Sequence, residues 1–226
     1  MTEDATIRLA KRVAEMVPCS RSEAETYIAG AFVSVDGVVV EEPGARVAPH
    51  QQVTLAPDAT LLDIAPVTIL LHKPAGVDAL SLLVPENRSA DAQRGRFLKR
   101  HVHNLTACLP LDASASGLFV FTQDFRVQRK LVQEGATMEQ EIIVDVEGQI
   151  AEGGLQRLNQ GAGKVSWQNE RRLRFAVKPP KPALIAKLCT DVGLRAISQK
   201  RLRIGRIAMS GLPEGQWRFL QPYERF

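Results

Sequence analysis

The chain has 226 residues, of which 45% are hydrophobic and 24% are charged, so it can bury a core and lacks the composition of a disordered protein. No stretch approaches the ~18 consecutive apolar residues of a membrane-spanning helix, and the acidic start at residues 1–4 argues against a secretory signal. The cysteines, Cys19, Cys108 and Cys189, are too scattered for a disulfide framework or a paired-cysteine metal site. These features predict a cytoplasmic protein.

The charge is distributed unevenly along the chain. Residues 1–60 carry 5 Lys/Arg and 9 Asp/Glu, whereas residues 61–226 carry 24 Lys/Arg and 16 Asp/Glu, although the net charge of the whole chain is only +4. A basic second part can neutralise phosphates, which makes nucleic acid a candidate partner. A solvated basic surface explains the same counts, so charge alone leaves both interpretations open.

Two short helices and a hairpin are predicted at the start of the chain. Apolar residues at helical spacing predict a helix over residues 7–17, which Pro18 ends. Ser20 and Glu23 form a capping box for a second helix that reaches about Ala29, and Gly30 is expected to end it as a C′ glycine. Residues 32–40 then predict a β-hairpin with a type I′ turn at Asp36–Gly37, and a strand is expected at residues 52–55.

This arrangement resembles the S4-type (alpha-L) RNA-binding domain. The matching runs are Arg8-Leu9-x-Lys11, residues 20–24, Gly30 and residues 35–37. The resemblance implies that the start of the second helix meets the RNA backbone, where free amides and the helix dipole suit phosphate. The contact residues it implies are Arg8, Lys11, Arg12, Ser20, Arg21 and Ser22. Ser22 stands where such domains often carry Arg, and a purely capping role for Ser20 remains an alternative.

A linker at residues 56–66 separates this module from a larger domain, so we expect domains at residues 1–62 and 63–226. The larger domain should contain strands at residues 67–71, 118–122, 141–146, 164–167, 173–177, 198–207 and 217–220. Helices are expected near residues 90–100, 126–134, 154–158 and 182–192, with Val127, Leu131 and Val132 on one face of the second of these. This order predicts an α+β fold with a mixed, mainly antiparallel sheet.

Asp112 is the most informative residue of the larger domain. It follows Pro110-Leu111 and precedes small residues, Gly117 and an apolar strand, so we expect it on a loop at the edge of the sheet. Such a place can expose a catalytic carboxylate on rigid support. An aspartate before serine and glycine is also a common turn former, and the local pattern does not separate the two roles.

An ordered set of motifs resembles pseudouridine synthases of the RsuA and RluF type. The motifs are Lys73-Pro74-x-Gly76, Leu111-Asp112-x-x-Ala115-Ser116-Gly117-Leu118, Val144-x-Val146-x-Gly148 and Lys200-Arg201-x-x-Ile204-Gly205. The resemblance covers nearly the whole chain and rests on the order of the set rather than on one motif.

The resemblance implies isomerisation of uridine to pseudouridine within RNA, without a cofactor or metal. In that family one aspartate either attacks the sugar or removes the C2′ proton, and Asp112 is the matching residue. The uridine must leave its stack to reach such a residue, and structured stem-loops of ribosomal RNA, or of transfer RNA, are the expected substrates.

Three positions depart from that family's pattern. Pro110 stands where Arg is usual, Ile142 where Tyr is usual, and Ala186 where an Arg is usual that pairs with the catalytic aspartate. Lys187 is one residue further along the helix, about 100° away, so it does not simply replace that Arg. The remaining candidate cations are Lys73, Lys181, Arg201 and Arg203, and the sequence does not choose among them.

These departures leave an alternative open. A catalytically inactive RNA-binding paralogue acting in ribosome assembly would keep the fold without the reaction, and an RNA chaperone is a third possibility. In the absence of a heptad pattern or a broad apolar stripe, we expect a monomer.

Overall fold

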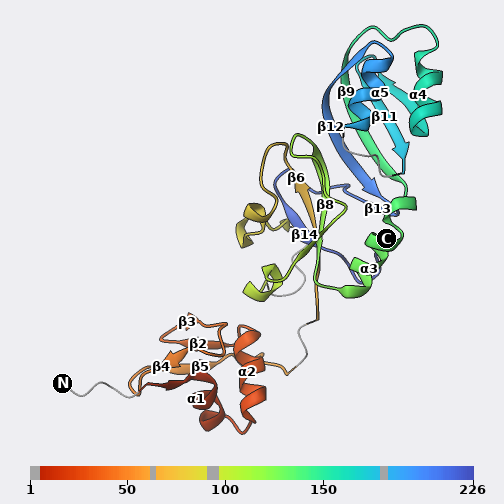
Figure 1. Cartoon of the computed structure of the whole chain (residues 1–226). Helices are drawn as coiled ribbons and strands as arrows, with labels where there is room; N and C mark the ends of the chain where they lie inside the picture. Colours follow the sequence, from red (N-terminus) through yellow and green to blue (C-terminus); the bar gives the residue numbers. More distant parts are fainter. Residues whose placement is uncertain (1–5, 62–64, 91–96, 179–182) are drawn as a thin grey trace. The chain divides into compact units, whose positions relative to one another are not determined.

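The computed structural model describes residues 6–61, 65–90, 97–178 and 183–226. The chain divides into two compact units (Figure 1), one formed by Met1–Ala65 with Arg96–His103 and the other by Pro66–Gly95 with Asn104–Phe226. Among the described helices, none is both long enough and apolar enough to cross a membrane.

The described part of the first unit contains two α-helices and five short strands. The helices are α1 (Leu9–Met16) and α2 (Arg21–Ala29), and the strands are β1 (Ile7–Arg8), β2 (Val33–Val35), β3 (Val38–Val39), β4 (Arg46–Val47) and β5 (Val53–Leu55). β1 pairs with β4, while β3, β2 and β5 form an antiparallel sheet in that order. Both helices pack on one core, in which Leu9, Ala24 and Ile28 are fully buried.

The predicted helix boundaries need two corrections. Ile7 does not begin α1, because it lies opposite Val47 in the β1–β4 pair and the helix begins at Leu9. Gly30 has a φ of −82°, and the left-handed residue after α2 is Ala31, with a φ of 59°. Glycine is needed at position 30 because a Cβ there would lie 2.7 Å from the ring of Phe32.

The predicted capping box and hairpin turn are confirmed. The Glu23 amide donates to the Ser20 hydroxyl at 3.2 Å, and the Ser20 amide donates to the Glu23 carboxylate at 2.6 Å. These bonds hold the pKa of Glu23 below its usual range. Asp36 and Gly37 both have positive φ, of 51° and 82°, as a type I′ turn requires.

The second unit is built on one mixed sheet. Its strands are β6 (Thr68–Lys73), β7 (Thr106–Cys108), β8 (Ser116–Thr122), β9 (Gln140–Gly148), β10 (Lys164–Asn169), β11 (Arg172–Val177), β12 (Leu194–Ile204), β13 (Ile207–Ala208) and β14 (Trp217–Phe219). The order is β10-β11-β9-β12-β8-β6-β14, with β13 on β12 and β7 on β8. Among the pairings between these described strands, only β12 with β8 is parallel. The predicted mainly antiparallel sheet is therefore confirmed.

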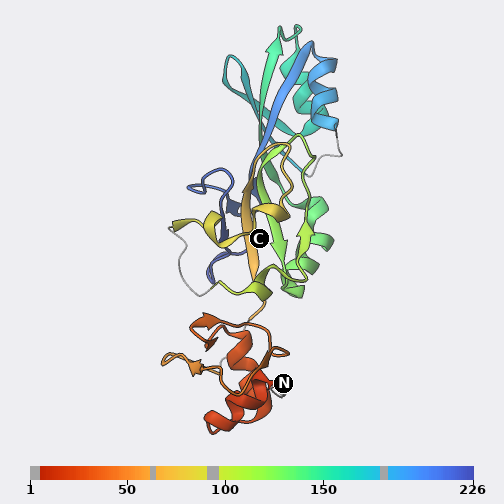
Figure 2. The ribbon, with the colours of Figure 1, turned by 90° about the vertical axis from the view of Figure 1, so that its left-hand side faces the viewer.

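Within the residues that the structure describes, three α-helices pack on this sheet: α3 (Phe125–Gln133), α4 (Gly154–Ala162) and α5 (Leu184–Asp191). Figures 1 and 2 show α4 and α5 on the same side of the β9–β12 half of the sheet, where Leu158 and Ile185 pack against Phe175. α3 buries Leu131 against a second core at β6 and β8.

Two helix predictions in the second part of the chain need revision. Val132 does not share the apolar face of α3, since it is 68% exposed, whereas Leu131 is buried in that core and Val127 packs against it. Of the helix expected near residues 90–100, residues 91–96 lie outside the described ranges, and Lys99–Val102 form a single 3₁₀ turn.

We predict that Ser20→Ala lowers the stability of the first unit by about 1 kcal/mol, because it removes the side-chain acceptor at the start of α2. Hydrogen exchange of the α2 amides in the full chain would measure the change. Ser22→Ala, whose side chain makes no capping bond, is the matched control and should leave the exchange rates nearly unchanged. Equal exchange in the two variants would contradict the stabilising role of the cap.

Candidate functional site

The loop from Leu109 to Ala115 carries Asp112 between β7 and β8. It begins at Leu109 in a left-handed conformation with a φ of 49°, and the Ala115 amide donates to the Asp112 carbonyl at 3.0 Å. The Asp112 side chain is exposed, and no described residue makes a hydrogen bond or an ion pair with its carboxylate. The structure therefore presents this carboxylate to solvent from an ordered loop.

Lys73, the last residue of β6, holds the second half of this loop. Its ammonium donates to the carbonyls of Ala113 at 3.3 Å, Ala115 at 3.2 Å and its neighbour Pro74 at 3.0 Å. The residue is only 5% exposed, so these carbonyls replace the water that a lysine normally keeps. The Gly76 amide adds a bond to the Ala113 carbonyl at 2.8 Å, so the Lys73-Pro74-x-Gly76 motif and the Asp112 loop form one structure.

Arg201, on β12, holds the beginning of the same loop. Its guanidinium donates to the carbonyls of Leu109 at 2.7 Å and Leu118 at 2.9 Å, and to the Gln140 side chain at 3.3 Å. Arg201 is 3% exposed, and burial lowers its pKa to about 9, so it remains charged at neutral pH. The Arg201 donors are thus committed to backbone and amide acceptors and make no bond to Asp112.

Gly117 is explained by the close approach of β8 and β12. It has a φ of +108°, and a Cβ at this position would lie 2.2 Å from the carbonyl oxygen of Arg201. Any other residue would force the two strands apart and move Arg201 away from the loop. The glycine of the Asp112 motif is therefore required for the close packing of β8 against β12.

The other predicted pocket residues do not gather around Asp112. Ile142 is 6% exposed and packs in the core under α4 and α5. Arg203 forms ion pairs with Glu139 at 2.6 Å and Glu141 at 3.3 Å. Lys187 is exposed on α5, and Lys181 lies outside the described residues. Pro110 is exposed within the Asp112 loop itself.

Ion pairs join side chains on the neighbouring strands β11, β9 and β12. Arg174 and Arg203 both bind Glu141 and lower the pKa of its carboxyl, with the Arg174 hydrogen bond as the largest cause. Arg172 and Ser198 bind Asp145 at 2.6 and 2.7 Å and likewise lower its pKa. Several cations of the basic second part are therefore already neutralised by neighbouring strands.

In the first unit, the predicted RNA-contact residues lie along α1 and at the start of α2. Arg8, Lys11, Ser20, Arg21 and Ser22 are exposed, and Arg12 is half-buried. Lys11 pairs with Glu15 at 3.9 Å and Arg21 with Glu25 at 3.7 Å, each one helical turn away. The Glu23 carboxylate occupies the start of α2, so its dipole is already complemented.

Sequence reasoning missed two residues of this site. Leu109 supplies both the left-handed turn and the carbonyl that Arg201 binds, and Gln140 supplies an acceptor for the same guanidinium although it is 2% exposed. A glutamine at the start of a strand can be identified as a site residue only when its hydrogen-bond partner is known. Within the described ranges, no cluster of three His, Cys, Asp or Glu side chains could hold a metal.

Comparisons with known proteins agree with this architecture. Residues 7–53 match the S4 domain family model. The chain is 25% identical over 236 residues to the dual-specificity RNA pseudouridine synthase RluF of Escherichia coli K12, covering 97% of this chain and 77% of that protein. It is 26% identical over 230 residues to the ribosomal large subunit pseudouridine synthase B of Haemophilus influenzae, covering 93% of this chain and 63% of that protein.

A solved structure of a pseudouridylate synthase matches with a TM-score of 0.56 at 16% identity, covering 95% of this chain and 96% of that one. At this identity the likeness shows the fold. The predicted fold, with an S4 domain at its beginning, is confirmed, and the chain is similar over nearly its whole length to RNA pseudouridine synthases.

We predict that Arg201→Met destabilises the second unit by roughly 2–4 kcal/mol, because the Leu109, Leu118 and Gln140 acceptors lose their donor. Denaturant unfolding followed by Trp167 and Trp217 fluorescence would report this unit, which contains both tryptophans of the chain. Arg171→Met, at an exposed position, is the control and should change stability by less than about 0.5 kcal/mol.

A pH dependence is expected from Glu141. Its pKa is lowered in the folded state, so its contribution to stability is present above its ordinary pKa near 4.5 and is lost as pH falls through the lower folded value. The stability difference between the wild type and Glu141→Gln, measured by the same unfolding assay, should therefore shrink on acidification below pH 4.5. A difference that stays constant or grows on acidification would contradict this assignment.

Proposed function

We propose that this chain is an RNA pseudouridine synthase and that Asp112 is its catalytic carboxylate. The observation that carries the proposal is the exposed carboxylate on a loop whose two ends are bound by the buried cations Lys73 and Arg201. A carboxylate that must meet one sugar carbon needs this kind of rigid support. The similarity to RluF and to the ribosomal large subunit enzyme supports the same reaction.

The reaction moves one bond and one proton. The glycosidic bond between N1 and C1′ breaks, the uracil turns, and C5 bonds to C1′. The proton on C5 is lost and N1 gains one, so the product is an isomer of the substrate. Asp112 acts either as the nucleophile at C1′ or as the base at C2′; both roles require its ionised form and neither requires a cofactor.

The substrate is a uridine in a structured stem-loop of ribosomal RNA, with transfer RNA as the second choice. A loop or bulge lowers the cost of unstacking the base so that its sugar can reach Asp112. The S4 domain contributes RNA contacts through Arg8, Lys11, Arg12, Ser20, Arg21 and Ser22, and Pro110 adds an apolar surface within the Asp112 loop. We further propose that the enzyme acts in the cytoplasm as a monomer.

One observation favours a second candidate function. No described cation binds the Asp112 carboxylate, because the donors of Lys73, Arg201 and Arg203 are bound elsewhere and Lys187 is exposed on α5. The alternative is a catalytically inactive RNA-binding paralogue in ribosome assembly, which would keep the fold and the RNA surface without the reaction.

Tritium release from RNA labelled at uracil C5 decides between the two functions. The RNA comes from a strain that lacks this gene, so the target uridines are unmodified. We expect release with the wild-type protein and a loss of at least about 10³-fold with Asp112→Asn, because the amide is neither a nucleophile nor a base.

Asp191→Asn, at the exposed end of α5, is the matched control and should release tritium at the wild-type rate. No release by the wild type, with RNA binding intact, would refute the enzymatic proposal and establish the binding paralogue. Full activity of Asp112→Asn would refute the assignment of the catalytic residue.

A further inference from the structure

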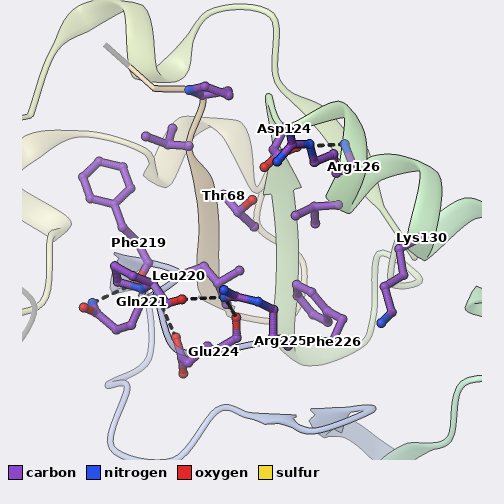
Figure 3. A pocket seen from close by; sticks show the side chains of 14 residues that line it. Thr68, Asp124, Arg126, Lys130, Phe219, Leu220, Gln221, Glu224, Arg225 and Phe226 are labelled. Atoms are coloured by element: carbon purple, nitrogen blue, oxygen red, sulfur yellow. Dashed lines mark hydrogen bonds between the residues drawn. The ribbon is translucent and has the colours of Figure 1, made fainter. Parts of the chain in front are cut away.

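A cleft runs beside α3, at a distance from the Asp112 loop. One cavity of about 470 Å³ lies between α3 and the final segment of the chain, and a second of about 490 Å³ shares Lys130, Arg225 and Phe226 with it. Figure 3 shows the first cavity, with Arg126 and Lys130 on the α3 side and Arg225 and Phe226 on the other.

This cleft lies at the opposite end of β8 from Asp112. Asp112 precedes Ser116, where β8 begins, whereas Thr68 lines the cleft and lies opposite Thr122, where β8 ends. A strand of 7 residues spans roughly 20 Å, so one ligand atom cannot touch both places. The cleft is therefore a separate feature of the second unit.

Cations outnumber the available acids around the cleft. Arg126, Lys130, Arg206 and Arg225 line the two cavities. Of the three acids that also line them, Glu224 is paired with Arg218 through two bonds of 2.7 Å, whereas Asp124, which caps α3 by accepting from the Arg126 amide at 2.7 Å, and Glu134 keep their negative charge. Four cations therefore face two unpaired acids. The surface is thus suited to an anionic partner.

Two exposed aromatic residues are sequence neighbours of residues that line the cleft. Phe125 is 68% exposed and Tyr223 is 80% exposed, and they are the aromatic residues among the large exposed hydrophobics of the described chain. Each is adjacent in sequence to residues that line the cleft: Phe125 to Asp124 and Arg126, and Tyr223 to Pro222 and Glu224. Exposed rings beside cations form a stacking platform for unpaired bases.

We propose that this cleft binds single-stranded RNA that flanks the modified uridine. The phosphates would lie against Arg126, Lys130, Arg206 and Arg225, and unpaired bases would stack on Phe125 and Tyr223. The proposal rests on the proposed function for the identity of the RNA. An acidic peptide would satisfy the cations, but it would leave the two aromatic rings without a role, so RNA is favoured.

RNA binding by the full chain tests the proposal. The probe is a labelled stem-loop with a 10-nucleotide single-stranded extension, compared with the same stem-loop without the extension. The cleft variant is Arg126→Gln with Lys130→Gln, and the control with equal charge change is Arg157→Gln with Arg171→Gln, at exposed positions of the same unit.

We expect the cleft variant to bind the extended probe about tenfold more weakly and to reduce the salt slope by about 1.4, or 0.7 for each phosphate that is no longer neutralised. The control should stay within about twofold. Phe125→Ala with Tyr223→Ala, which changes no charge, should weaken binding of the extended probe by about tenfold and that of the bare stem-loop hardly at all.

Equal losses of affinity in the cleft variant and the control would overturn the proposal, because they would show a general charge effect. The proposal would also be overturned if both the cleft and the aromatic variants bound the extended probe with wild-type affinity. A further contrary result is a cleft variant that loses affinity for an acidic peptide such as polyglutamate but not for RNA. The control variant, Arg157→Gln with Arg171→Gln, should release tritium at the wild-type rate. Failure of the wild type to release tritium would count against the proposed function, while the binding comparison would still decide the role of the cleft.

Discussion

Two buried cations that are solvated by backbone carbonyls hold the candidate site together. Lys73 and Arg201 are each at least 95% buried, and none of their hydrogen bonds goes to a carboxylate. Burying a charge is costly unless enough acceptors replace its water, so the carbonyls between Leu109 and Leu118 must stay where these cations need them. The conformation of the Asp112 loop is therefore set by the requirement to solvate two charges inside the sheet.

This requirement ties together parts of the chain that are far apart in sequence. Lys73 ends β6 and Arg201 lies on β12, and both reach the loop that precedes β8. The parallel pairing of β8 with β12 brings Arg201 near enough, and Gly117 permits that approach because it has no Cβ. A substitution in any of these strands would therefore move the Asp112 carboxylate even if the substituted residue makes no contact with Asp112.

The two units divide the tasks that the similarity to pseudouridine synthases implies. Residues 1–60, which include the S4 domain, carry a net negative charge, and the basic residues Lys11 and Arg21 of that domain pair with glutamates on their own helices. The second unit carries the exposed carboxylate and the cation-lined cleft beside α3. RNA affinity is therefore expected to depend strongly on the second unit, with the S4 domain adding contacts of lower charge density.

Local sequence patterns are enough to predict the capping box at Ser20, the turn at Asp36–Gly37 and the presence of most strands, because each depends on residues within a few positions of one another. They also place Asp112 on a loop before a buried strand. They do not reveal the partners of Lys73 and Arg201, or the exposure of Val132, since these depend on which strands become neighbours in the sheet. Lys73, Arg201 and Arg203, three of the cations predicted to pair with Asp112, bind carbonyls or glutamates instead, because a buried charge takes the acceptors that the fold brings nearest. Only the tertiary arrangement decides which acceptors those are.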